Sequence, residues 1–282
     1  MPRIGSSTHG ESRIRLLRIV RRGDRHDPKE LTVSLRFEGE FAAAFRDGRS
    51  DLVLPGETLK TLVHAAARKA GDSEIEALGL ILCERILSKT PRITRARVEI
   101  AEESWTRLQA RGKAQGQAFM AGGSAHNNAV ITSNGGQTAV VAGFDRLLLM
   151  RTAGFAPSPR DDDDDGVSDR LQRLLVGSMD ARWTYTSADV TFRPYREGVR
   201  AAIIETFACH ASASVQHTLY AIADVILATY EEIADVTLAF HEHPYRPADL
   251  FSAGIENPDE LFVALEEPLS VVEVTVERDE SR

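Results

Sequence analysis

The same order of predicted secondary-structure elements occurs twice along this chain. Hydrophobic spacing predicts two strands, two helices and further strands before Gly143, and the same order follows after it. Expected strands of the first copy are 13–21, 31–37, 94–100 and two within 118–142, and its helices begin near residues 57 and 73. Expected strands of the second copy are 147–152, 183–192, 236–240 and 271–278, and its helices are 195–208 and 214–229. Two such ββααββ halves indicate a duplication, with a first half at 10–137 and a second at 138–280.

Side-chain patterns inside these segments support the assignments. Alternate residues of 31–37 are large and apolar, which is typical of a strand with one buried face; they are Leu31, Val33, Leu35 and Phe37. Asp72 and Ser73 are expected to cap a helix. Apolar residues follow them at three- and four-residue intervals, at Ile75, Leu78, Leu82 and Ile86. The sequence therefore predicts sheets that bury one face against helices.

Composition excludes several classes of protein. The chain has 282 residues and a formal net charge of −8, which disfavours nucleic acids and anionic membranes as partners. Its apolar runs are shorter than the roughly 20 residues that cross a bilayer, and its first residues lack the hydrophobic core of a secretion signal. Cys83 and Cys209 are the only cysteines, and both are expected to be reduced. Together these features predict a cytoplasmic protein.

One stretch of the second half suggests a ligand site. Residues 212–227 begin with serines and continue with apolar residues at helical spacing, so a helix is expected to begin close to Val215. Gln216 then lies in the first turn, where backbone N–H groups are unpaired and the positive end of the helix dipole points outward. The Val215 N–H and the Gln216 amide would form a flat fork that fits the edge of a planar heterocycle. The alternative is a solvated glutamine on an ordinary helix.

The stretch 212–220, SASVQHTLY, resembles a helix in the second half of uricase, the cofactor-free urate oxidase. Further stretches resemble that family in order and spacing: DRHD at 24–27, ARVEI at 96–100, DARWTY at 180–185, ENPDELF at 256–262 and EVTVER at 273–278. The resemblance implies the tunnelling fold, an α+β architecture of two ββααββ halves in which antiparallel sheets carry helices on one face. It also implies chains that assemble into an oligomeric barrel, usually a homotetramer with active sites at subunit interfaces.

Positions that bind the purine in uricases have counterparts here. The resemblance places Arg173 at the position of the arginine that grips the purine, and a guanidinium fork suits two acceptors on one ring edge. Val215 and Gln216 match the amide clamp of the family, and Phe155 matches the aromatic ring that stacks on the purine. The resemblance therefore implies that these four residues hold a planar heterocycle.

Positions that move protons in uricases are replaced in this chain. In that family a lysine, a threonine and a histidine form a relay, and dioxygen reacts directly with the electron-rich purine dianion. The lysine position holds Glu11 here, and the threonine and the aspartate after it read Gly56 and Glu57. The positions of an asparagine and of the relay histidine hold Glu242 and Pro244. The relay of the family is therefore absent from these positions.

Three carboxylates, those of Glu11, Glu57 and Glu242, are expected to converge where the family keeps one cation and one aspartate. Like charges would oppose the binding of anionic urate, and they would raise the pKa of one carboxyl group toward neutrality, which suits a general base. A neutral or amine-bearing purine- or pterin-like ring would fit such a pocket better than urate. These three glutamates are the catalytic candidates.

His241 and His243 offer a metal-binding alternative. A His-x-His pair on a strand directs both rings to one face, and Glu11 or Glu57 would complete a set of two histidines and one carboxylate. Strand alternation, however, directs Glu242 toward the pocket and both histidines away from it. The main expectation is therefore a site without a metal, and a metal at His241 and His243 is the alternative.

The leading hypothesis is an oxidoreductase that oxidises urate or, in preference, a related purine- or pterin-like heterocycle. Dioxygen is the expected co-substrate, and no cofactor is expected. Two alternatives stay open: a catalytically inactive heterocycle-binding or assembly protein, and a metal-dependent hydrolase that uses His241, His243 and a glutamate. The expected assembly is a homo-oligomer, with four chains as the resemblance implies.

Overall fold

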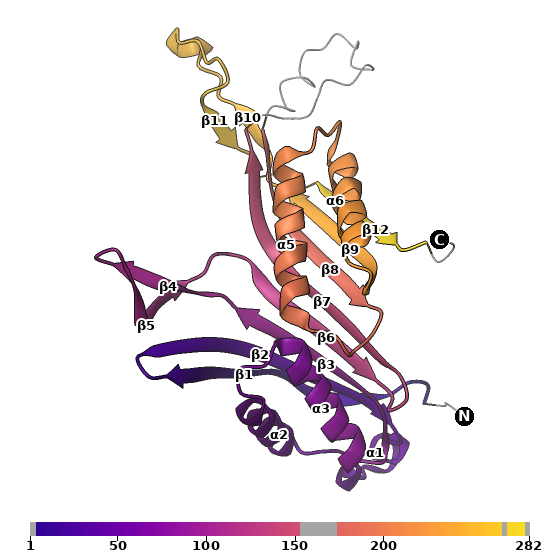
Figure 1. Ribbon diagram of the computed structural model, residues 1–282. Coiled ribbons are helices and arrows are strands. Elements are labelled where there is room, and N and C mark those ends of the chain that lie inside the picture. Colours follow the sequence, from indigo (N-terminus) through magenta and orange to yellow (C-terminus); the bar gives the residue numbers. More distant parts are fainter. Residues whose placement is uncertain (1–3, 153–173, 267–269, 280–282) are drawn as a thin grey trace. The chain divides into compact units, whose positions relative to one another are not determined.

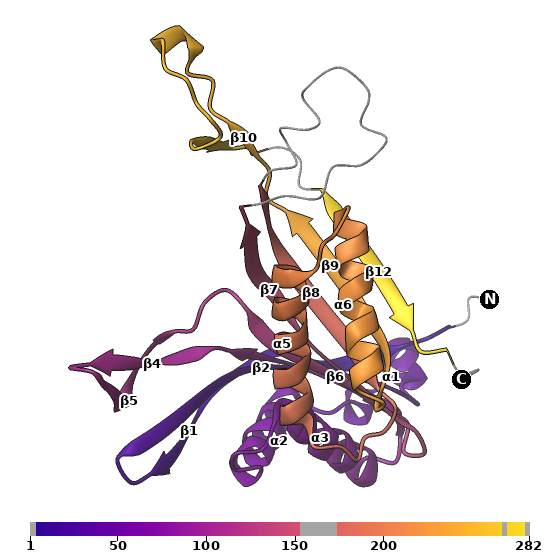
Figure 2. The same ribbon diagram turned by 45° about the horizontal axis from the view of Figure 1, so that its top comes forward.

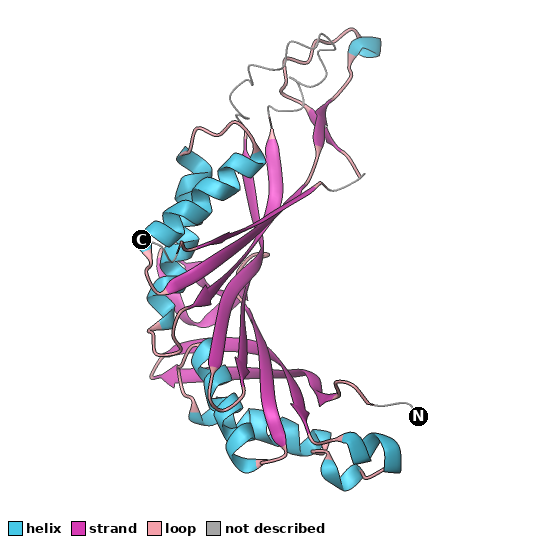
Figure 3. Ribbon diagram, turned by 90° about the vertical axis from the view of Figure 1, so that its right-hand side faces the viewer, coloured by secondary structure: helices cyan, strands magenta, loops and turns pink. Residues whose placement is uncertain are grey.

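The computed structural model describes residues 4–152, 174–266 and 270–279, and the chain separates into two compact units (Figure 1). The first unit comprises residues 1–144 and 184–193, and the second comprises 145–183 and 194–282. Each unit contains an antiparallel sheet with helices on one face (Figure 3). The fold is therefore α+β, as predicted, whereas the duplication boundary at 137/138 stays a prediction.

The sheet of the first unit has the strand order β1-β2-β3-β6. These strands are β1 (Thr8–Arg22), β2 (Arg25–Gly39), β3 (Ile93–Glu103) and β6 (His126–Ser133). Neighbouring strands are antiparallel, and Leu35 of β2 pairs with Val98 of β3, which pairs with Ile131 of β6. Helices α2 (Gly56–Lys69) and α3 (Ile75–Lys89) pack on this sheet. Two strands, two helices and further strands thus follow one another as predicted.

Apolar alternation explains the core of this unit. The four apolar residues of the predicted 31–37 strand are at most 1% exposed, and the predicted apolar face of α3 is buried with them. Full burial of one large aliphatic or aromatic side chain stabilises a fold by about 1.5–3 kcal/mol. The pleat directs alternate side chains of β2 to the same side, and the helical period does the same for α3, so the two faces meet. The predicted apolar faces are confirmed, whereas the predicted cap is wrong: Glu74 is the N-cap of α3, and no side-chain hydrogen bond within the described residues caps this helix.

The second unit has the strand order β7-β8-β9-β12. These strands are β7 (Thr138–Arg151), β8 (Leu175–Tyr185), β9 (Ile233–Glu242) and β12 (Val271–Glu277), and β7 and β8 each extend into the first unit at one end. Helices α5 (Phe192–Cys209) and α6 (Val215–Thr229) belong to it (Figure 2). In the described parts of the chain, no helix has the length and apolar character needed to cross a membrane.

Strand β8 lies earlier in the chain than expected. The sequence pattern predicts a strand at 183–192, but β8 ends at Tyr185 and α5 begins at Phe192. A polar turn separates them, in which the Asp189 N–H donates to Ser187 Oγ at 3.0 Å. The rings of Tyr185 and Phe192 pack edge to face with centroids 5.3 Å apart, so an aromatic pair closes this turn. The predicted strand at 183–192 therefore contains the end of β8, a turn and the first residue of α5.

Two hairpins were not predicted as separate elements. The first consists of β4 (Trp105–Ala110) and β5 (Lys113–Ala121), so residues 118–142 contribute to three strands instead of two. Arg107 holds this hairpin in place: its guanidinium donates to Asp27 Oδ1 at 2.7 Å and to the Gly116 carbonyl at 2.6 Å. The same guanidinium lies 4.8 Å from the centroid of the Phe119 ring. A single side chain thus explains why the 24–27 motif and the hairpin lie together.

The second hairpin consists of β10 (Tyr245–Pro247) and β11 (Phe262–Ala264). Asn257 organises the loop between them, because its Nδ2 donates to the Ala248 carbonyl at 3.0 Å and to the Leu261 carbonyl at 2.8 Å. Its Oδ1 accepts the Leu261 N–H at 3.0 Å. The 256–262 motif therefore has a structural role. The remaining short helices, also unpredicted, are α1 (Ala42–Asp47), η1 (Ser50–Leu52) and η2 (Phe251–Ala253).

Candidate active site

The N-terminus of α6 lies where the sequence predicts it, with Val215 as the first residue of the helix. Ser214 is the N-cap: its Oγ accepts the His217 N–H at 3.1 Å, and its carbonyl accepts the Thr218 N–H at 3.0 Å. The backbone N–H groups of Val215 and Gln216 come before these two, and no hydrogen bond within the described residues engages them. Val215 is buried and Gln216 is exposed. The helix thus presents two open donors and one flexible amide.

Polar contacts that sequence reasoning missed fix the loop before α6. His210 Nδ1 lies 2.6 Å from Ser212 Oγ, and Ser212 is only 1% exposed. His217 Nδ1 accepts the Ala213 N–H at 3.3 Å, and the rings of His210 and His217 pack edge to face at 4.9 Å. These contacts hold the backbone that leads into the clamp. The two histidines on either side of the serines were the available signal in the sequence.

Glu242 lies at the same end of the second unit as the clamp. β9 follows α6 after a short turn and packs against it, so the carboxyl end of β9 and the N-terminus of α6 share one end (Figure 2). Alternate residues of β9 are buried, namely Val236, Leu238 and Phe240, and Glu242 continues this series. Its N–H donates to the Ser270 carbonyl at 2.8 Å. The register of β9 therefore places Glu242 on the helix side of the sheet.

His241 belongs to the opposite face of β9. Its Nε2 lies 3.3 Å from Asp180 Oδ2 of β8, and Asp180 Oδ1 accepts the Arg146 N–H at 2.8 Å. β9 pairs with β12 without a register shift, so the slip that would bring His241 to the helix side does not occur. His243 follows the strand, and its N–H donates to the Val176 carbonyl at 2.8 Å. Among the described residues, no three His, Cys, Asp or Glu side chains are grouped to hold a metal ion.

Glu11 lies against the N-terminus of α2 in the first unit. It is on β1, just before the register of β1 with β2 shifts between Glu11 and Ile14. A Cβ atom added to Gly56, the first residue of α2, would lie 2.8 Å from Glu11 Oε2. A side chain at position 56 would therefore require the flexible end of Glu11 to move. Glu11 and Gly56 lie against each other, so two of the replaced relay positions are neighbours.

Glu57, the next residue of α2, forms an ion pair that sequence reasoning missed. Lys60 Nζ donates to Glu57 Oε1 at 2.8 Å, one helical turn away. This hydrogen bond lowers the pKa of the Glu57 carboxyl group, and the positive charge of Lys60 adds to the effect. Glu57 is therefore not the carboxyl group whose pKa the sequence predicts to be raised. The sequence held the signal, because glutamate and lysine three residues apart on a helix are neighbours.

Two predicted substrate-binding residues, Phe155 and Arg173, lie outside the described residues. Val215 and Gln216 are adjacent on α6, and Glu242 shares their end of the second unit. Glu11 and Glu57 both lie at the N-terminal end of α2 in the first unit. The convergence of Glu242 with these two carboxylates stays a prediction, as do the roles assigned to all of these side chains.

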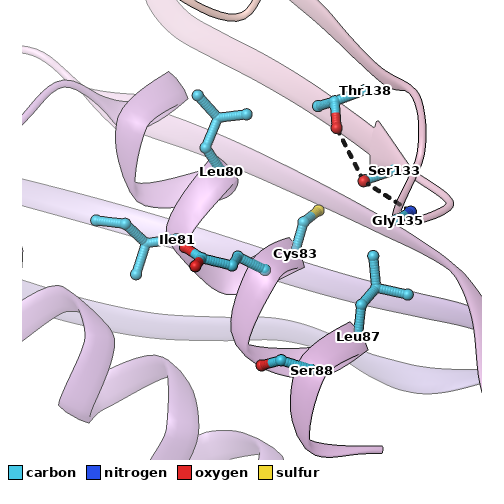
Figure 4. Close-up of a pocket in the computed structure, with 9 residues that line it drawn as sticks. Leu80, Ile81, Cys83, Leu87, Ser88, Ser133, Gly135 and Thr138 are labelled. Atoms are coloured by element: carbon cyan, nitrogen blue, oxygen red, sulfur yellow. Dashed lines mark hydrogen bonds between the residues drawn. The ribbon is translucent and has the colours of Figure 1, made fainter. Parts of the chain in front are cut away.

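A separate open cavity of about 560 Å³ lies in the first unit between α3 and the β6–β7 turn, and none of the predicted site residues lines it (Figure 4). Ser133 Oγ and Thr138 Oγ1 are 2.9 Å apart at its rim. Cys83 lies at its base and is 2% exposed, and burial raises the pKa of its thiol to about 12. A thiol with that pKa stays protonated near neutrality and is a poor nucleophile. Cys83 is therefore a packing residue.

Comparison with known proteins gives one family that matches most of the chain. The family model described as Uricase matches residues 7–132 and 140–275. The uricase of Arthrobacter globiformis is 28% identical over 281 residues, which cover 99% of this chain and 91% of that protein. The uricase of Dictyostelium discoideum is 27% identical over 279 residues, which cover 97% of each. The matched residues include the clamp at Val215–Gln216 as well as the replaced positions Glu11, Gly56 and Glu57.

Solved structures give the same result for the fold. The crystal structure of the Arthrobacter globiformis uricase aligns with a TM-score of 0.88 and 27% sequence identity, covering 100% of this chain and 97% of that one. The tunnelling fold that the resemblance implied is therefore confirmed.

Proposed function

Because this chain belongs to the uricase family, we propose that it oxidises a planar purine-like heterocycle with dioxygen and without a cofactor. It is an oxidoreductase that resembles urate oxidase. Urate, which the names of its relatives point to, and neighbouring purine- or pterin-like rings are the proposed substrate class. We assign substrate binding to Val215, Gln216, Phe155 and Arg173.

The observation that carries this proposal is the open N-terminus of α6. Two backbone N–H groups without a partner among the described residues lie beside the exposed Gln216 amide, which offers both a donor and an acceptor. Such a set complements the carbonyl and ring N–H groups along one edge of a purine. The positive end of the helix dipole also favours a ring that carries negative charge.

The proton step needs a carboxylate that is free to accept a proton. Glu57 is engaged by Lys60, so we assign proton acceptance to Glu11 or Glu242 and a charge-pairing role to Glu57. Transfer of a ring N–H proton to the carboxylate leaves an electron-rich anion and a neutral carboxylic acid. That anion reduces dioxygen directly, so the protein supplies binding, orientation and proton transfer.

We also propose a cytoplasmic homo-oligomer, with a tetramer and active sites at subunit interfaces as the family implies. The second hairpin supports self-association, because it exposes large apolar side chains: Phe251 is 90% exposed, Ile255 58% and Leu261 52%. Clusters of this kind are common at protein–protein contacts. Cys83 and Cys209 are free, which fits a reducing compartment.

The proposed function is tested by dioxygen uptake on metal-free protein, with urate first and then a panel of xanthines, amine-bearing purines and pterins. Consumption of dioxygen in step with the loss of heterocycle absorbance, unaffected by a chelator, supports the proposal. Absence of uptake with every compound in the panel would refute it.

The replaced relay favours one second candidate, a protein that binds heterocycles without oxidising them. Glu11 and Gly56 occupy the positions of a lysine and a threonine that take part in proton transfer in the family, and neither residue offers the amine or the hydroxyl group of that relay. Tight heterocycle binding with no dioxygen uptake across the panel would establish this candidate instead.

A further inference from the structure

Lys60, near the N-terminal end of α2, carries a positive charge that has no assigned role toward the substrate. Lys60 Nζ lies 2.8 Å from Glu57 Oε1, and its side chain is 41% exposed. The pKa of Lys60 is raised, first by the hydrogen bond and the charge of Glu57, and also by the charge of Glu11. Lys60 is therefore within electrostatic range of both carboxylates in this part of the molecule.

The arrangement of charges around Lys60 is asymmetric. Glu57 is paired with Lys60 and is largely exposed, with 86% of its side chain accessible. Glu11 is half-buried, and its carboxylate lies against Gly56. Pairing of Lys60 with Glu57 cancels one of the two negative charges and leaves one carboxylate, that of Glu11. A site with one uncompensated carboxylate repels an anion far less than a site with two.

The end of α2 adds to this compensation. Its N-cap is Pro55, which makes no side-chain cap, and the first backbone N–H groups that bond within the helix are those of Thr58 and Leu59, both to the Pro55 carbonyl. The positive end of the helix dipole therefore acts on the Glu11 carboxylate beside it. Lys60 and the helix end together provide positive charge next to the two glutamates.

We propose that Lys60 supplies the positive charge with which this site accepts a heterocycle in its anionic form, while Glu11 stays available to take the next proton. This inference rests on the proposed function, in which Glu11 and Glu57 border the substrate. It changes the substrate class expected from the sequence, because anionic purines such as urate become acceptable and a neutral ring is no longer required. The lysine position of the family lies on β1, where this chain has Glu11. Lys60 instead lies on α2, one helical turn from Glu57.

The test is anaerobic titration of the full-length protein with urate, near neutral pH, followed by absorbance or calorimetry. Without dioxygen, binding is measured apart from oxidation. Lys60→Met is expected to bind urate about tenfold more weakly, and Lys60→Arg within about threefold of the unaltered protein. Glu57→Gln, which frees the ammonium group, is expected to bind urate about threefold more tightly. Hypoxanthine, which is neutral near this pH, should show no dependence on Lys60.

Lys69→Met is the matched control, because Lys69 is exposed in the last turn of the same helix and is expected to leave urate affinity unchanged. An exposed ion pair contributes little to stability, so the Lys60 and Glu57 variants should remain folded, which circular dichroism checks. Equal urate affinity in folded Lys60→Met and unaltered protein would overturn the inference, and so would failure of the unaltered protein to bind any anionic purine. Lys60-dependent binding without dioxygen uptake would uphold the inference while refuting the proposed oxidation.

Discussion

The N-termini of α2 and α6 use the same backbone feature in two ways. At α2, Pro55 provides no side-chain cap and the Glu11 carboxylate lies against Gly56. At α6, Ser214 caps the helix and the first two N–H groups have no partner among the described residues. Helix N-termini attract negative charge because of their unpaired N–H groups and the helix dipole. α2 receives that charge from its own chain, whereas α6 is open to a ligand.

The difference suggests a division of roles between the two units. Residues at α2 carry titratable groups, and residues at α6 carry hydrogen-bonding groups that match a ring edge. Changes at α2 should therefore act mainly on the rate of oxidation and on charge preference, and changes at α6 should act mainly on affinity. Substitutions at the two helix ends test this division of roles.

Replacement of Glu11 should have the largest effect. Glu11→Gln removes the proposed proton acceptor with little change in size, and turnover is expected to fall about 100- to 1,000-fold, as is typical for loss of a general base. Anaerobic urate affinity should be unchanged or higher, because a negative charge is lost. Steady-state dioxygen uptake and anaerobic titration measure the two quantities. Unchanged turnover would assign the proton to Glu242 instead.

Replacement of Gln216 should lower the affinity for the heterocycle, in contrast to replacement of Glu11, which should lower turnover. Gln216→Ala removes the amide of the clamp, and affinity is expected to fall about 10- to 100-fold, since a buried polar edge of the ligand loses its partner. Asp224→Ala, at an exposed position further along α6, is the control and should bind normally. Anaerobic titration of both variants decides the point. Equal affinities in the two variants would remove Gln216 from the site.

Replacement of Ser214 tests whether the cap positions the clamp. Ser214→Ala loses the acceptor for the His217 N–H, and the free energy of unfolding is expected to fall by about 1 kcal/mol. Denaturant unfolding measures this loss. Ser214→Asp retains a capping acceptor and should recover most of it. A variant with Ala that is as stable as the unaltered protein would mean that the contacts of His210 and Ser212 hold this end alone.

Replacement of Gly56 should have the smallest effect. The added Cβ of Gly56→Ala would lie 2.8 Å from Glu11 Oε2, so the flexible carboxylate must move. Turnover is expected to fall about threefold, from loss of general-base geometry, with little change in stability because Ala also favours the helix. In a Glu11→Gln background the same substitution should slow turnover less, which a double-mutant cycle measures. Fully additive effects would mean that Gly56 and Glu11 act independently.

Much of the fold could be predicted from hydrophobic periodicity. Alternating apolar residues in β2, and apolar residues three and four apart in α3 and α6, each fit one type of element with one buried face. The strand predicted at 183–192 was placed too late in the chain, because Trp183 and Tyr185 belong to the end of a strand pattern. That pattern begins upstream, at Leu175, after residues that show no recognisable spacing. The hairpin of β4 and β5 was missed because it is held by Arg107, a long-range contact that local spacing does not reveal.

The site was only partly predictable from the sequence. The start of α6 at Val215 could be predicted because the cap and the first turn are adjacent in the chain, whereas the binding role of Val215 and Gln216 stays a prediction. Glu11 and Gly56 are far apart in sequence, so only the structure reveals that the Glu11 carboxylate lies against Gly56. Lys60 was not among the predicted site residues because it is not one of the replaced relay positions, although it lies three residues beyond Glu57 on the same helix.

Direct oxidation by dioxygen is tested by rapid mixing of an anaerobic complex of metal-free protein and urate with dioxygenated buffer. Urate absorbance is expected to decay in a single turnover, at a rate that rises with dioxygen concentration and is insensitive to chelator. An absorbance that stays constant while urate remains bound would contradict the central claim of direct oxidation by dioxygen.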